Sequence, residues 1–116
     1  MSKLATYDAD GWELADAEEM HQQYPETFWI PDATERENLN LGDIVKLRFL
    51  ILEIDSDTGE QIVSGERMWV KVAAREGDGY RGILDNESCY FSVLTSGVEL
   101  YFEPRHIIDI WSNEQE

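Results

Sequence analysis

Residues 68–84 read MWVKVAAREGDGYRGIL, a stretch that decides the fold. Apolar side chains recur at every second position of its first part, which is the period of a β-strand with one buried face. The apolar face is Met68, Val70 and Val72, and the other face is Trp69 and Lys71. The two glycines of Gly77-Asp78-Gly79 are typical of a tight hairpin turn, and residues 80–84 then form the returning strand. The stretch therefore predicts an antiparallel β-hairpin.

The same alternation begins earlier, in residues 44–51. One parity carries Ile44, Lys46, Arg48 and Leu50, and the other carries Val45, Leu47, Phe49 and Ile51. One apolar face and one charged face are typical of an antiparallel strand that is solvated on one side. Turn residues follow at 55–59, and further short strands are expected at 90–93, 98–102 and 107–111. The pattern predicts an α+β, mainly β fold: a curved antiparallel sheet or small SH3-like barrel of five to six strands with an N-terminal helix.

The first third of the chain differs in composition, with dense acids and few β-branched residues. Strong helix formers predict a helix from Leu14 to Gln23, and Pro25 ends it because the residue before a proline avoids the helical region. A shorter helix is expected from Ala33 to about Asn38, since Asp32 and Glu35 have the spacing of a capping box. We expect a single domain over residues 1–116, with an acidic N-terminal arm over 1–40 and a β-rich core over 41–116.

The charge is strongly acidic, with 25 Asp and Glu against nine Lys and Arg and a formal net charge of −16. Nucleic-acid binding depends mainly on Lys and Arg contacts with phosphates, and anionic membranes repel an acidic surface. The composition therefore argues against nucleic acid and membrane partners and favours a basic protein; no oligomeric state is predicted. Cys89 is the only cysteine and the start of the sequence has no apolar leader, so we expect a cytoplasmic protein.

Candidate metal and catalytic residues are few. Asp55, Asp57 and Glu60 superficially resemble a calcium-binding loop, but the glycine stands fifth instead of sixth and a third ligand is missing. We interpret them as an acidic hairpin turn. The two histidines have no Cys or His neighbour at metal-binding spacing, and we interpret both His106 and Cys89 as structural. No metal, cofactor or catalytic residue is predicted.

Trp69 lies on the face of its strand opposite to Met68, Val70 and Val72, and two interpretations of its surroundings are open. It lies on a surface or in a groove under the N-terminal arm, or Phe28, Trp29 and Ile30 of the arm cover it as a second small core. We favour the second interpretation, because large exposed apolar patches are uncommon on soluble monomers. If Trp69 and Trp111 are exposed, they are suitable anchors for a partner, since interface hot spots favour Trp.

A family resemblance rests on three segments, 65–72, 80–86 and 102–110, which read GERMWVKV, YRGILDN and FEPRHIIDI. Over about residues 27–111 the chain resembles a group of small acidic bacterial domains of unknown function. In these domains a hydrophobic-Trp-Val-x-Val strand precedes a glycine-containing return strand that ends in Asp-Asn. Related small acidic domains occur among immunity proteins of bacterial toxin systems. The resemblance implies a bacterial source and a non-enzymatic β-rich domain, and it supplies no catalytic residues.

These observations give a first hypothesis, a non-enzymatic binding module whose acidic surface pairs with a basic protein. Its sharpest form is an immunity protein that blocks a nuclease toxin, because a nuclease cleft is basic to match its anionic substrate. The expected partner-binding residues are Glu53, Asp55, Asp57, Glu60, Trp69 and Trp111. The alternative is a small-molecule-binding or enzymatic domain with a site in the concave face of the sheet. Its anion-holding residues are Arg48, Lys71, Arg75 and Arg81.

Overall fold

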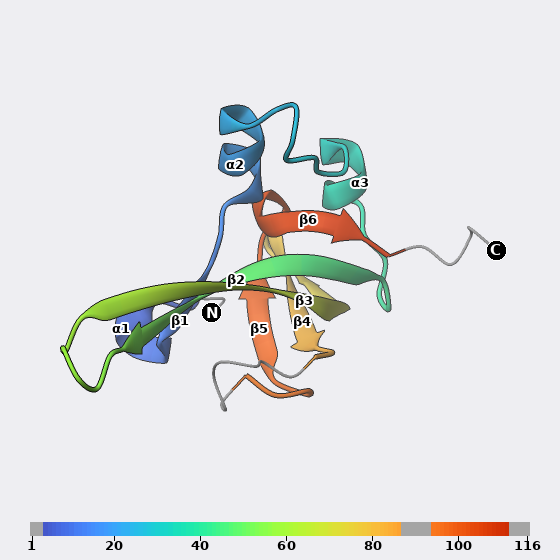
Figure 1. Cartoon of the computed structure of the whole chain (residues 1–116). Helices are drawn as coiled ribbons and strands as arrows, with labels where there is room; N and C mark the ends of the chain where they lie inside the picture. Colours follow the sequence, from blue (N-terminus) through green and yellow to red (C-terminus); the bar gives the residue numbers. More distant parts are fainter. Residues whose placement is uncertain (1–3, 87–93, 112–116) are drawn as a thin grey trace.

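A long β-hairpin lies at the centre of the computed structural model, which describes residues 4–86 and 94–111 (Figure 1). Strand β2 (Ile44–Ile54) pairs antiparallel with β3 (Gln61–Glu76), from Ile44 opposite Lys71 to Ile54 opposite Gln61. Buried and half-exposed residues alternate along most of β2. The strand predicted for residues 44–51 is therefore confirmed, and it continues three residues further.

The remaining strands curl this hairpin into a half-barrel. Gly77 turns the chain with a φ of +55°, a conformation that favours glycine, and leads into β4 (Gly79–Leu84). Strand β5 (Glu99–Phe102) pairs with β4, and a 3₁₀ helix, η1 (Pro104–His106), leads to β6 (Ile107–Ile110), which returns to pair with β2. The predicted mainly β, curved antiparallel sheet is confirmed. The short strand expected at 90–93 lies outside the described residues.

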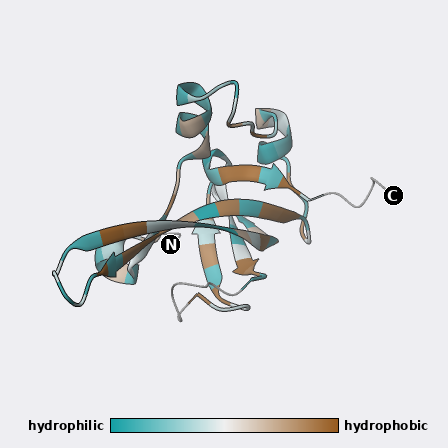
Figure 2. Cartoon of the chain, in the orientation of Figure 1, coloured by the Kyte–Doolittle hydropathy of each residue, from teal (hydrophilic) through white to brown (hydrophobic). Residues whose placement is uncertain are grey.

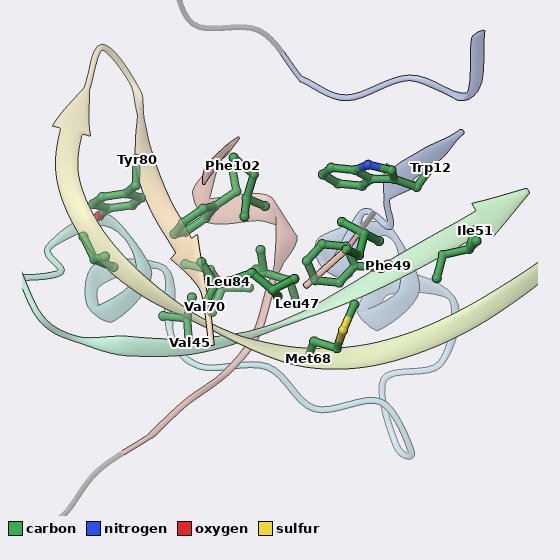
Figure 3. Close-up of a cluster of buried hydrophobic side chains, with 14 residues drawn as sticks. Trp12, Val45, Leu47, Phe49, Ile51, Met68, Val70, Tyr80, Leu84 and Phe102 are labelled. Carbon is green, nitrogen blue, oxygen red and sulfur yellow. The ribbon is translucent and has the colours of Figure 1, made fainter. Parts of the chain in front are cut away.

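The hydrophobic core fills the concave side of the sheet (Figure 3). The alternating apolar residues of β2 and β3 face one another there, with Leu47 opposite Met68. Phe49 is fully buried and its ring centroid lies 5.2 Å from that of Trp12. Burial of one such side chain contributes about 2 kcal/mol. Tyr80, Leu84 and Phe102 close the opposite wall of the core.

Two short elements of the N-terminal arm were not expected from the sequence. Helix α1 (Tyr7–Asp10) starts after Thr6, whose hydroxyl accepts a hydrogen bond from the amide of Ala9 at 3.2 Å. Strand β1 (Trp12–Leu14) pairs with β2 opposite residues 49–51. The arm therefore supplies one strand of the sheet, and with Trp12 it supplies part of the core.

The two expected helices are present with corrected boundaries. The predicted start of the first helix at Leu14 is wrong, because Leu14 ends β1. The helix, α2 (Ala17–Gln23), begins after Asp16, whose carboxylate accepts a hydrogen bond from the amide of Glu19. Helix α3 (Ala33–Glu37) confirms the second helix. The capping box expected there is wrong, because the side chain of Asp32 makes no capping hydrogen bond.

Arg36, on α3, is a buried base that fixes the arm to the half-barrel. Its Nε donates to the carbonyl of Pro31 at 2.8 Å, and its Nη1 donates to Glu18 Oε2 at 2.6 Å and to the carbonyl of Pro104 at 3.1 Å. The carbonyl of Arg36 itself accepts a hydrogen bond from the Tyr80 hydroxyl at 2.8 Å. One residue therefore connects α2, the segment before α3, η1 and β4.

Replacing Arg36 with Met is expected to lower the free energy of unfolding by about 3 kcal/mol, because two carbonyls and a carboxylate lose their donor in a buried site. Arg81→Met is the matched control. The Arg81 side chain is 48% exposed, and surface ion pairs such as its pairs with Glu76 and Glu99 contribute less than about 1 kcal/mol. Urea unfolding followed by tryptophan fluorescence measures both variants. Equal losses would contradict the anchoring role of Arg36.

Candidate functional site

The β2–β3 hairpin projects beyond the half-barrel and carries exposed apolar side chains next to an acidic turn (Figure 1, Figure 2). We call this part, residues 52–63, the hairpin end. Ile54, Ile62 and Val63 are 67%, 46% and 50% exposed. In the described part of the chain no third strand pairs with the hairpin end. Ile54 and Val63 lie on the outer face of this ribbon, and Ile62, opposite Glu53, lies on the other face. Single exposed apolar residues are ordinary, but a projecting ribbon with exposed apolar side chains on both faces is typical of a contact surface.

Two of the four acids predicted here shape the turn, and two do not. The carboxylate of Asp55 accepts hydrogen bonds from two main-chain amides of the turn, the nearer one at 2.8 Å from Asp57. Glu53 accepts a hydrogen bond from the Ser64 hydroxyl at 2.7 Å. The side chains of Asp57 and Glu60 are exposed and make no hydrogen bond or ion pair with any described residue. Asp57 and Glu60 are therefore the acids that a partner can reach at no cost to the turn.

The two tryptophans of the predicted set lie at the other end of the sheet. Trp69 is eight residues along β3 from Gln61, or roughly 26 Å at the rise of a strand. It is half-buried, and the Lys46 ammonium lies 4.7 Å from its ring centroid. Trp111 follows β6, is 51% exposed, and donates its amide to the carbonyl of Ile44. The structure thus separates the acidic group, Glu53, Asp55, Asp57 and Glu60, from Trp69 and Trp111.

The N-terminal arm lies beside β6 and the outer face of β2. Its residues 27–31 line a groove of about 530 Å³ together with Lys46 and Arg67. Trp29 is 76% exposed, so the interpretation in which it helps to bury Trp69 in a second core is wrong. The cation–π contact of Lys46 covers the Trp69 ring instead.

Two of the four bases considered for an anion site, Arg81 and Arg75, make contacts with other side chains of the protein. Arg81 forms ion pairs with Glu76 at 3.5 Å and with Glu99 at 4.0 Å. The guanidinium of Arg75 lies over the ring of Tyr80, 4.9 Å from its centroid. The four bases therefore do not converge on one site, and the core side chains occupy the concave face in which that site was expected.

The other two bases belong to a cluster on the outer face of the sheet. Arg48 and Lys71 alternate with buried residues of β2 and β3, and so do Lys46 and Arg67. The register sets Arg48 opposite Arg67, places Lys46 one step further along the same face and places Lys71 two steps further. We call these four residues the basic face. Lys46 and Arg67 were not predicted as members of an anion site. The alternation indicates that they share a face with Arg48 and Lys71, because residues two apart on a strand point to the same side.

His106 has a structural role, as expected from the sequence. The amide of Glu103 donates to its Nδ1 at 2.9 Å, so the ring completes the turn into η1. Burial lowers the pKa of His106 to about 4, and the neighbouring Arg105 cation acts in the same direction. The hydrogen bond from Arg105 in turn lowers the pKa of Glu103. The imidazole is therefore neutral near pH 7 and its acceptor nitrogen is occupied.

The remaining candidates for catalysis or metal binding are His21, Cys89 and the acidic side chains. His21 Nδ1 lies 2.6 Å from the carbonyl of Phe28, which ties α2 to the segment lining the groove. Cys89 lies outside the described residues. Within residues 4–86 and 94–111, no three His, Cys, Asp or Glu side chains are grouped to hold a metal ion.

Comparisons with known proteins add no assignment: the chain matches no protein-family model, no curated protein and no solved structure. In the part of the chain that the structure describes, no helix is both long and apolar enough to cross a membrane. The geometry therefore offers two candidate surfaces, the hairpin end and the basic face.

Lowering the pH from 6.5 to 4 is expected to destabilise the protein through His106. Its pKa is about 4 in the folded state and about 6.5 in the unfolded chain, so the unfolded chain binds a proton first. The free energy of unfolding then falls through this window by up to about 3 kcal/mol, and the loss levels off below pH 4. Urea unfolding at a series of pH values measures the effect. His106→Asn keeps an acceptor without titrating and should flatten the profile; an unchanged profile would refute the assignment.

Proposed function

We propose that the protein is a binding module that engages a basic protein partner through the hairpin end. The observation that carries this proposal is the hairpin end itself: Ile54 and Val63 are exposed on one face and Ile62 on the other, beside Asp57 and Glu60, which have no described partner. Apolar side chains supply the area buried on binding, and the adjacent acids select a partner of opposite charge.

The charge distribution supports the same proposal. The four bases of the basic face contribute +4 to a total of −16, so the remainder of the chain carries −20. A surface this acidic attracts a basic partner over distances set by the Debye length, about 8 Å at physiological ionic strength. Association should therefore be fast at low salt and slower at high salt.

The most specific form of the proposal is an immunity protein that inhibits a nuclease toxin in a bacterium. A nuclease cleft must be basic to hold its anionic substrate, and a projecting acidic hairpin is a suitable shape for such a cleft. The resemblance to small acidic bacterial domains, some of them related to immunity proteins, supports this form.

Under this proposal the protein binds a basic partner and has no catalytic activity. The hydrogen bond of His106 supports this, because Nδ1 of the neutral ring accepts from the Glu103 amide and is not available as a general base.

A photo-crosslinking amino acid at Ile62 is expected to trap one basic protein in cells of the source organism. The same amino acid at Ile83, an apolar residue of β4 that is 36% exposed, should trap little of it. Mass spectrometry identifies the product. An assortment of proteins at Ile62, or equal trapping at Ile83, would refute the hairpin end as the contact surface.

The trapped partner then allows a kinetic test. Asp57→Asn with Glu60→Gln should lower its association rate about three- to tenfold at low salt, and less at high salt, because two steering charges are lost. Glu26→Gln with Asp78→Asn removes the same charge from exposed sites elsewhere and should have a smaller effect. Stopped-flow fluorescence measures the rates. Equal rates in the two double variants would mean that net charge alone, and not the hairpin end, governs association.

A further inference from the structure

The outer face of β2 and β3 concentrates positive charge in an acidic protein. Four of the nine bases lie there, at Lys46, Arg48, Arg67 and Lys71. None of the four forms an ion pair with a described Asp or Glu, whereas Arg36, Arg81 and Arg105 each do. Asp109 of β6 is opposite Lys46, and no described acid is paired in register with Arg48, Arg67 or Lys71. With 25 acids in the chain, this concentration of bases on one face points to an anionic group from outside.

The arrangement of the two arginines strengthens this conclusion. Arg48 and Arg67 are directly opposite each other on neighbouring strands, where like charges destabilise a sheet. Gly65 leaves room for the Arg48 side chain: a Cβ at Gly65 would lie 2.6 Å from Arg48 Nη2. The guanidinium thus lies over Gly65, two residues from Arg67 along β3, and a bound carboxylate would offset the repulsion between the two arginines.

The groove next to the basic face adds an apolar wall. Lys46 and Arg67 belong to both, and apolar residues 28–31 of the arm and Ile108 and Ile110 of β6 also line the groove, although more of its surface is polar than apolar. Two acids also line the groove, Glu35 and Asp109. One carboxylate oxygen of Asp109, Oδ1, accepts a hydrogen bond from the amide of the next residue, Ile110, at 2.9 Å.

From these features we infer that the basic face and its groove bind a short, extended acidic segment of a partner protein. The Cα atoms of Lys46 and Arg48 are two residues apart along β2, or about 7 Å, and alternate Cα atoms of an extended peptide have the same spacing. Acids at alternate positions would therefore contact successive bases while the apolar residues between them enter the groove. Three consecutive residues of β6, 108–110, line the groove, and within the described chain β6 pairs only with β2, so a peptide strand has an edge to lie against.

A nucleic acid fits this surface less well. Its phosphates continue beyond a patch of four bases and would meet a surface that carries −20. A peptide of a few residues confines its charge to the patch and uses the apolar groove. This inference concerns a different surface from the hairpin end, and either can fail without the other.

Selection of phage-displayed random dodecapeptides on the full chain tests the inference even while the natural partner is unidentified. We expect enrichment of sequences with Asp or Glu at alternate positions and apolar residues between them. Fluorescence anisotropy with the selected peptide then measures affinity. Arg67→Gln should weaken binding about tenfold, and Arg67→Lys should restore part of it, because a positive charge returns.

Arg81→Gln is the matched control, since it removes one base from another part of the sheet and should leave affinity unchanged. Circular dichroism checks that each variant is folded. The inference is overturned if selection yields no acidic sequences, if Arg81→Gln weakens binding as much as Arg67→Gln, or if an oligo-dT probe binds more tightly than the selected peptide.

Discussion

The buried guanidinium of Arg36 is the interaction on which the arrangement of both halves of the chain depends. A charged group at 5% exposure is tolerated only if its donors are satisfied, and here two carbonyls and one carboxylate accept from it. Those acceptors come from three separate segments, so a single desolvated charge fixes their mutual positions. The groove follows from this, because Pro31 both accepts from Arg36 and lines the groove opposite β6.

The β2–β3 hairpin divides its two faces between stability and binding. The concave face holds the apolar core, while the outer face changes along its length (Figure 2, Figure 3). Near β6 it is basic, at Arg48 and Arg67; further out it becomes apolar, at Leu52 and Val63; and it ends in the acidic turn. Because the inner face alone supplies the core, the outer face is free to carry charges and apolar groups that folding does not require.

Local patterns in the sequence predicted the strands well, and long-range contacts account for what they missed. The alternation in β2 and β3 identified both strands and the face of Lys46, since period two follows directly from the backbone. Strand β1 was missed because three residues are too few for a pattern, and only its pairing with β2 makes it a strand. The distance between the acidic turn and Trp69 could be predicted only with the register of the strands. The role of Arg36 could not be predicted, because it depends on contacts between residues 68 positions apart.

The same geometry determines whether the two surfaces can influence each other. Gln61, beside the acidic turn, and Arg67 of the basic face are separated by roughly 20 Å along β3, about two and a half Debye lengths at physiological ionic strength. Direct electrostatic coupling across the solvent is therefore largely screened, and a peptide on the basic face would not neutralise the hairpin end. Any coupling has to pass through the strands themselves. Residues 46–71 supply both surfaces, and the inner face of the same strands packs in the core. A shift in β2 or β3 large enough to couple the surfaces would therefore also disturb the packing of Phe49 and Met68.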